Sequence, residues 1–112
     1  MIAHLVLYEL RPDLADADRT RFLEALEHAI ENIPTVRGVR FGRRHLIGAG
    51  YEAIATPAFS FFALFEFENI AGLKAYLDHP AHVALGQLFW SCCLRTLVFD
   101  YEIGDAEAIK SW

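Results

Sequence analysis

The sequence predicts an α+β protein of the ferredoxin-like type, with the element order β-α-β-β-α-β and a second helix that is broken. Segments rich in β-branched and aromatic residues alternate with segments whose apolar residues recur at helical spacing. A chain of 112 residues has room for one domain. We expect that domain to span residues 1–103, followed by a short tail over 104–112. The predicted fold is a four-stranded antiparallel sheet with helices on one face.

The first half of the chain predicts a strand, a helix and a second strand, over residues 2–10, 17–33 and 36–46. In the first segment, strand alternation places His4, Val6 and Tyr8 on one face. The helical segment carries an apolar stripe that includes Leu26, and Pro34 ends it.

The second half predicts a strand, a helix in two pieces and a last strand, over residues 59–67, 70–78, 81–93 and 94–103. The break between the helical pieces falls at His79-Pro80, where proline suits the first turn of a new helix. In the second piece His82, Leu85 and Phe89 are spaced on one helical face.

The apolar content of the chain predicts a partner. Hydrophobic residues make up 54% of the sequence, whereas soluble domains usually contain about 45–50%. The segment FSFFALFEF carries Phe61 and Phe65 on one face and Phe62 and Leu64 on the other. Helices cover only one face of the sheet, so the other face needs a second sheet. We therefore expect two copies to close into an α+β barrel as a symmetric homodimer.

The segment between the second and third predicted strands is unusually apolar for a loop. It reads IGAGYEAIATPA over residues 47–58, although surface loops are generally polar. Two interpretations stay open: the loop folds over a pocket, or it enters an interface.

The charge of the chain argues against broad binding to nucleic acid. The formal net charge is −5, and phosphate backbones require a basic surface. One local cluster, Arg37, Arg40, Arg43 and Arg44, offers a site for nucleic acid or a phosphorylated ligand. No aromatic stacking pattern accompanies the arginines, which favours a solvated strand whose charges deter edge pairing. We expect no nucleic-acid partner.

The sequence also predicts no membrane partner and a cytoplasmic location. The longest nearly apolar stretch, Pro57–Phe65, is far shorter than the ~20 residues of a membrane helix. The N-terminus lacks the basic region of a signal peptide.

Cys92 and Cys93 are adjacent in the sequence, and this spacing suits neither a disulfide nor a redox pair. We expect both to be small apolar helix residues.

Three residues are candidates for chemistry: His4 on the first strand, and Tyr76 and His82 on either side of the helix break. If the helices cover the His4 face, the three polar groups converge between sheet and helices. Histidine acts as a general base near neutral pH, and a tyrosine beside it donates a hydrogen bond to a developing oxyanion. The alternative is that both histidines are half-buried polar groups whose hydrogen bonds are satisfied within the protein, without a role in chemistry. Tyr76 would then contribute only to packing.

A metal site is the weaker interpretation of the histidines. His79, His82 and His4 supply three imidazoles, but histidines three apart across a helix start need not converge. The H-E-x-x-H pattern of zinc enzymes is absent. We predict neither a metal nor a cofactor.

Several short motifs together resemble one family. They are Met1–Leu7, Val36-Arg37-Gly38-Val39, Phe67-Glu68, Tyr76-Leu77-Asp78-His79-Pro80-Ala81-His82 and Val98-Phe99-Asp100-Tyr101. Over residues 1–103 the chain resembles the stress-responsive A/B barrel domain family. The resemblance implies the dimeric α+β barrel that the element order also predicts.

The family includes stress-linked proteins without established catalysis and a plant polyketide cyclase. By resemblance to the cyclase, His82 is the base of an aldol condensation, Tyr76 assists it and His4 lines the pocket. Leu26 and Phe61 stand where that enzyme has a pocket tyrosine and a pocket histidine, which implies a more apolar pocket. Phe89 and His79 complete the set of residues expected to line it.

The sequence therefore predicts a homodimer whose pocket binds a small apolar or carbonyl-bearing ligand. If the protein is an enzyme, we expect acid–base chemistry without a cofactor, as in a lyase, cyclase or isomerase. One alternative is a non-catalytic, stress-responsive binding or structural dimer. A further alternative is a cofactor-free monooxygenase, because the wider superfamily contains such enzymes.

Overall fold

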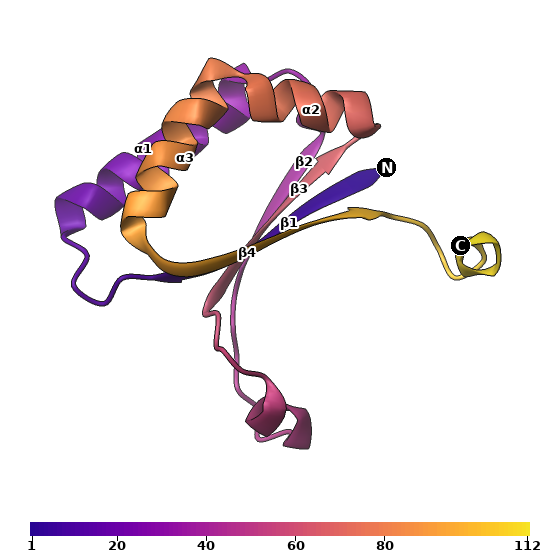
Figure 1. The fold of residues 1–112 in the computed structure, drawn as a ribbon, viewed down its shortest axis with the longest axis horizontal. Coiled ribbons are helices and arrows are strands. Elements are labelled where there is room, and N and C mark those ends of the chain that lie inside the picture. The colour runs from indigo at the N-terminus through magenta and orange to yellow at the C-terminus, as the bar shows by residue number, and fades with distance from the viewer.

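The computed structural model, which describes residues 1–112, contains one antiparallel sheet with helices on one of its faces (Figure 1). The strands are β1 (Ile2–Leu10), β2 (Gly38–Arg43), β3 (Phe61–Phe67) and β4 (Cys93–Glu102). The helices are α1 (Asp16–Asn32), α2 (Ile70–Asp78) and α3 (Pro80–Cys92), with short 3₁₀ helices η1 (Gly50–Ile54) and η2 (Ala108–Ser111). The strand order is β2-β3-β1-β4. The predicted ferredoxin-like α+β fold, with its broken second helix, is confirmed.

The main difference from the predicted elements concerns β2. Its predicted range, 36–46, shortens to Gly38–Arg43 because the chain leaves the sheet beyond Arg44. The sequence also predicts a turn or a bulge at Gly38 and Gly42, yet the pairing with β3 is regular from Gly38 to Arg43. Gly42 serves another purpose: a Cβ there would lie 1.9 Å from Cε1 of Phe62. The missing side chain therefore makes room for the Phe62 ring across the strands.

Strand pairing divides the sheet into a helix face and an open face. His4 pairs with Phe65 on β3 and with Asp100 on β4, and these side chains share the helix face. The next position, Leu5, pairs with Leu64 and Phe99, and these side chains share the opposite face. We call this second surface the open face; its apolar side chains are Leu5, Leu7, Phe62, Leu64, Leu97, Phe99 and Tyr101. No element of the chain covers it (Figure 1).

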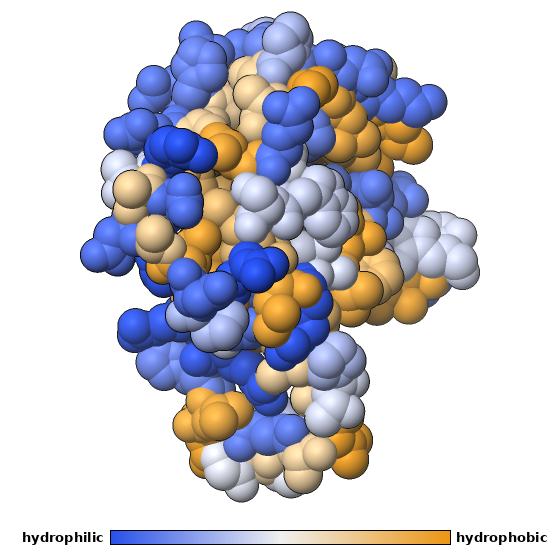
Figure 2. Space-filling view, turned by 60° about the vertical axis from the view of Figure 1, so that its left-hand side comes forward, coloured by the Kyte–Doolittle hydropathy of each residue, from blue (hydrophilic) through white to orange (hydrophobic).

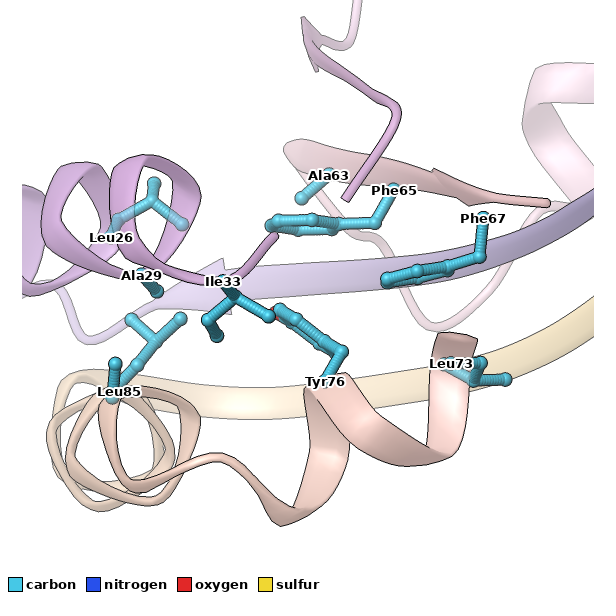
Figure 3. Packing of buried hydrophobic residues seen from close by; sticks show 10 residues of the cluster. Leu26, Ala29, Ile33, Ala63, Phe65, Phe67, Leu73, Tyr76 and Leu85 are labelled. Carbon is cyan, nitrogen blue, oxygen red and sulfur yellow. The ribbon is translucent and has the colours of Figure 1, made fainter. Parts of the chain in front are cut away.

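The hydrophobic core lies between the helix face and the helices (Figure 3). Phe65 and Phe67 of β3 point towards Tyr76 of α2, with ring centroids 5.2 and 5.1 Å from that of Tyr76. On the other side of the core, Ala29 of α1 is fully buried beside Leu85 of α3. Contact between α1 and α3 is close, so these two helices form a roof over the sheet.

The break between α2 and α3 is fixed by two caps. The Asn69 side chain accepts a hydrogen bond from the Gly72 backbone N–H (2.9 Å) at the start of α2. At the start of α3, Nδ1 of His79 accepts one from the Ala81 N–H (3.0 Å), and Pro80 occupies the first turn. The caps set the direction of both helices and so position Tyr76 and His82 on either side of the break.

Replacing Asn69 with alanine is expected to lower the free energy of unfolding by about 1 kcal/mol, because the Gly72 N–H loses its partner. Chemical denaturation measures this change. Asn69→Asp keeps an oxygen acceptor and should retain most of the stability. Equal destabilisation by both substitutions would show that the cap does not stabilise α2.

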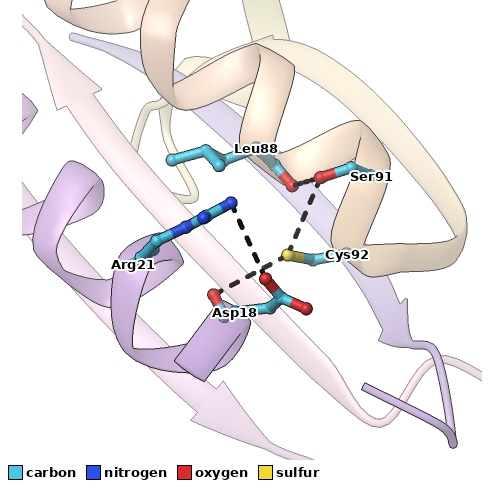
Figure 4. A network of polar contacts seen from close by, with 5 residues as sticks. All are labelled: Asp18, Arg21, Leu88, Ser91 and Cys92. Atoms are coloured by element: carbon cyan, nitrogen blue, oxygen red, sulfur yellow. Dashed lines mark hydrogen bonds and ion pairs between the residues drawn. The ribbon is translucent and has the colours of Figure 1, made fainter. Parts of the chain in front are cut away.

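Polar contacts join the start of α1 to the end of α3 (Figure 4). Sγ of Cys92 lies 4.0 Å from the Asp18 carbonyl oxygen, and Arg21 pairs with the Asp18 carboxylate at 3.6 Å. Both cysteines are free and buried. Burial raises the pKa of Cys93 to about 12, so its thiol stays protonated at neutral pH. Cys92 ends α3 and Cys93 begins β4, so the expectation of a helix residue is confirmed for Cys92 and corrected for Cys93.

Two segments project from the body of the protein (Figure 1). One is the β2–β3 loop, residues 44–60, which carries η1; the other is the C-terminal tail, residues 103–112, which carries η2. The loop is held at its base, where the Ser60 N–H donates to Oε2 of Glu9 (2.6 Å) and Nε of Arg95 donates to the Ala58 carbonyl (2.8 Å). Its tip bears apolar surface (Figure 2), and Ile54 is 83% exposed.

No helix combines the length and the apolar character that crossing a bilayer requires.

Candidate functional site

A cavity of about 210 Å³ lies between the helix face of the sheet and the roof formed by α1 and α3. Of its 16 lining residues, 13 are hydrophobic. A cavity of roughly 150 Å³ in a protein core accepts benzene. The space therefore fits a ligand the size of one ring or a short chain. The polar side chains of His4, Tyr76 and His82, which the sequence predicts to converge, all line this one cavity.

His82 stands in the first turn of α3 with one ring nitrogen already engaged. Its Nδ1 lies 3.1 Å from the Leu77 carbonyl oxygen. A carbonyl oxygen only accepts hydrogen bonds, so Nδ1 carries the proton, and the Nε2 of the neutral ring is bare. Burial lowers the pKa of His82, and the nearby His4 lowers it further against the opposing effect of the Leu77 bond. At neutral pH His82 is therefore a neutral imidazole with Nε2 free to accept a proton.

Tyr76 lies beside His82, with ring centroids 4.5 Å apart. The tyrosine is only 2% exposed, and burial raises the pKa of its phenol well above the ordinary value. The hydroxyl thus stays protonated at neutral and mildly alkaline pH. A base and a hydrogen-bond donor are adjacent in one apolar cavity.

His4 forms a hydrogen-bonded pair with Asp100, a residue that the sequence does not predict to lie at the site. Its Nδ1 lies 2.6 Å from Oδ1 of Asp100, directly across the β1–β4 ladder. The carboxylate fixes the ring orientation, since it accepts the Nδ1 proton and leaves Nε2 bare in the neutral ring. His4 itself is 5% exposed, and its ring centroid is 5.9 Å from that of Tyr76. Strand alternation in the sequence of β4 places Asp100 on one of the two sheet faces. Only the register of β4 against β1 shows that this is the face that carries His4.

The other predicted lining residues divide into two groups. Leu26 and Phe89 line the cavity, while Phe61 and His79 do not. Phe61 instead stacks on Tyr8, with ring centroids 5.5 Å apart, and Tyr8 is the residue that reaches the cavity. The prediction that His79 lines the pocket is corrected, because its Nδ1 caps α3.

Aromatic residues missed by the sequence interpretation form much of the remaining wall. Phe22 of α1 stacks on Phe89 of α3 with centroids 6.0 Å apart, and Tyr8 meets Phe89 edge-on at 5.7 Å. Phe41 of β2 and Trp90 of α3 also line the cavity, although they are 50% and 66% exposed. These two exposed side chains mark the rim of the pocket.

Two further interpretations of the sequence, a metal site formed by the histidines and a loop that folds over the pocket, concern this region. No group of three or more His, Cys, Asp or Glu side chains is arranged to hold a metal ion. The β2–β3 loop contributes no residue to the cavity wall. Of the two interpretations of that loop, folding over the pocket of its own protomer is therefore wrong.

Comparison with known proteins assigns the family. The family model described as the stress responsive A/B barrel domain matches residues 2–103. The chain belongs to this family. A curated relative, olivetolic acid cyclase of Cannabis sativa, is 24% identical over 103 residues, which cover 89% of this chain and 94% of the cyclase.

Solved structures share the fold of this stress responsive A/B barrel protein. Hydroxynitrile lyase from Passiflora edulis matches with a TM-score of 0.77 at 13% identity, covering 94% of each chain. A dimeric ferredoxin-like protein of unknown function from Thermobifida fusca matches with a TM-score of 0.69 at 20% identity, covering 91% of this chain and 90% of that one. At these identities the likeness concerns the fold.

Proposed function

We propose that the cavity binds a small, mainly apolar ligand with a carbonyl group and that His82 removes a proton from the carbon next to it. The observation that carries this proposal is the arrangement of His82. Its Nδ1 is committed to the Leu77 carbonyl, its Nε2 is left for a ligand, and the protonated Tyr76 is adjacent. A base and an oxyanion donor side by side are what enolisation requires.

The step is balanced without a cofactor. Nε2 of His82 takes the proton from the α-carbon, the electrons of that C–H bond form a C=C bond to the carbonyl carbon, and the π electrons of the carbonyl move onto its oxygen. The Tyr76 hydroxyl donates a hydrogen bond to the enolate oxygen that forms. The enolate then takes its proton back from His82 at carbon, as in an isomerase. Alternatively its carbon attacks a second carbonyl of the same ligand, and the oxygen of that carbonyl takes the proton from His82, as in a cyclase. Asp100 and His4 act as a positioned pair beside the reacting group.

Relatives support this reaction class. One relative has the name of a cyclase and one structural neighbour the name of a lyase. In this chain the cavity walls are largely apolar, so the ligand should carry its polar group at one end only.

Hydrogen–deuterium exchange tests the proposal without knowledge of the natural ligand. Methyl ketones with apolar substituents of one ring or a short chain are incubated with the protein in D₂O and followed by NMR. We expect the protein to accelerate exchange of the α-protons of at least one ketone that binds. Binding of several ketones without any acceleration would contradict the proposed chemistry.

The pH dependence of the exchange rate follows from His82. Because the pKa of His82 is lowered from 6.5, its basic form persists below the pH at which an ordinary imidazole is half protonated. The rate should stay level down to about pH 6.5 and fall only at lower pH. Tyr76 adds no alkaline decline near neutrality, since its pKa is raised. A rate that increases on acidification would contradict the role of His82 as a base.

We also propose that the protein is a homodimer that closes through the open face. Structural neighbours from Thermobifida fusca and Bacteroides fragilis are described as dimeric. The open face of this chain presents a contiguous set of apolar side chains, and Phe99 in its midst is 41% exposed. A second copy would bury this surface, and two such sheets would form the α+β barrel.

A non-catalytic binding protein is the second candidate. The observation that favours it is that each imidazole already has Nδ1 engaged within the chain, His82 with the Leu77 carbonyl and His4 with Asp100. Such a protein would bind ketones and hydrocarbons of the same shape with similar affinity and would exchange no protons. An enzyme of the proposed kind would prefer the ketone and accelerate its exchange.

A further inference from the structure

We infer that the C-terminal tail (residues 103–112) of one protomer lies along the outer edge of β2 of its partner and covers the rim of the partner's pocket. This inference rests on the homodimer proposed above.

The tail is separate from its own protomer. The last backbone bond to the sheet runs from the Ile103 N–H to the Met1 carbonyl (2.9 Å), and the hydrogen bonds of later residues stay within the tail. Ile109 and Trp112 are 63% and 62% exposed. Figure 1 shows this segment extending away from the sheet. Apolar side chains on such a projection are expected to be covered by another surface.

The outer edge of β2 is a suitable receiving surface. β2 is an edge strand, so one side of its backbone has no neighbouring strand. Arg40, Arg43 and Arg44 are exposed, and none takes part in an ion pair. Phe41 lies among them and is 50% exposed. The edge thus combines positive charge with an apolar residue.

The charges decide which edge of the partner receives the tail. The end of β4 and the tail carry Glu102, Asp105 and Glu107, all exposed. Lys110 is the only basic residue and pairs with Glu107 at 3.0 Å, so the segment keeps a net negative charge. The other free edge of the sheet is β4 itself, which leads into this same acidic segment. A tail placed there would meet like charge. Along β2 it would meet the arginines, and two-fold symmetry would form the contact twice.

The contact also involves the candidate site. Phe41 lines the cavity and is half exposed at its rim. A partner tail along β2 would place Ile109 or Trp112 near Phe41 and exclude water from that side of the pocket. The pocket of each protomer would then be closed by the other protomer.

Charge reversal in two variants tests the inference. Arg43→Glu/Arg44→Glu makes both surfaces acidic, and Glu102→Lys/Glu107→Lys makes both surfaces basic. Each variant alone should dimerise at least 10-fold more weakly than the wild type in sedimentation experiments. In an equimolar mixture the acidic β2 edge meets the basic tail, and the remaining arginines meet the native acids. The mixture should therefore recover a heterodimer of near wild-type affinity.

A matched variant and the wild type separate the possible failures. Glu24→Lys/Glu27→Lys makes the same charge change on exposed positions of α1 and should leave the dimer unchanged. A monomeric wild type at micromolar concentration would overturn the homodimer and this inference together. A dimeric wild type whose two variants dimerise normally, or fold but do not recover on mixing, would overturn the tail contact and leave the homodimer standing.

Discussion

Replacing His82 with alanine is expected to abolish accelerated α-proton exchange while leaving ligand binding nearly intact. The substitution removes Nε2, the only base that the account assigns to the reaction, and general bases contribute about 10²–10⁴-fold to a rate. Because His82 is on the cavity wall, the variant should still bind the ketone in the remaining apolar space. Exchange rates from NMR and affinities from calorimetry measure the two effects separately.

Two further variants accompany this experiment, one as a control and one as a test of Tyr76. His28→Ala removes an exposed imidazole from α1, and the exchange rate should not change. Tyr76→Phe keeps the ring packing and removes the hydroxyl, so it should slow exchange without shifting the acid limb of the pH profile. Full exchange activity in His82→Ala would contradict the proposed mechanism, whichever ketone is used.

Replacing Leu64 with aspartate is expected to convert the dimer into a monomer. Leu64 lies on β3 in the middle of the open face, paired with Leu5 of β1 and Arg40 of β2. In the barrel its side chain would be buried against the second sheet. Desolvating this carboxylate, even beside the cross-strand guanidinium of Arg40, costs several kcal/mol per ion. A symmetric dimer would bury two copies, so we expect the dissociation constant to rise by at least roughly 10²-fold. Gel filtration coupled to light scattering measures the mass directly.

The matched control for this variant is Leu23→Asp. Leu23 is 51% exposed on α1, on the helix side of the sheet, so the same substitution there should leave the dimer intact. Loss of the dimer in both variants would indicate general destabilisation. A Leu64→Asp protein that remains a dimer would exclude the open face as the interface.

Local patterns were sufficient to predict most of the fold. The predicted ranges 2–10 and 70–78 agree with β1 and α2, because strand alternation and an Asn cap are encoded within each segment. The predicted end of β2 at residue 46 is wrong, since residues 44–46 are chemically similar to the strand although the chain has left the sheet. That boundary depends on tertiary contacts of the loop base with Glu9 and Arg95, which lie far along the chain.

The candidate site was predictable only in part for the same reason. His4, Tyr76 and His82 converge because the topology brings β1 under the break between α2 and α3. Asp100 was missed because its contact with His4 spans 96 residues and depends on the register of β4. The prediction for His79 is wrong because a histidine before a helix can either line a pocket or cap the helix. Only the direction of the backbone decides between these two roles.

The proposed chemistry depends most on the state of one side chain, since His82 acts as a base only if Nε2 is bare. Nitrogen-15 NMR of the imidazole at neutral pH measures that state directly. The Leu77 bond predicts a neutral ring with the proton on Nδ1 and a bare Nε2 whose resonance shifts when a ketone binds. A ring protonated on Nε2, or an Nε2 resonance that bound ketone leaves unchanged, would contradict it.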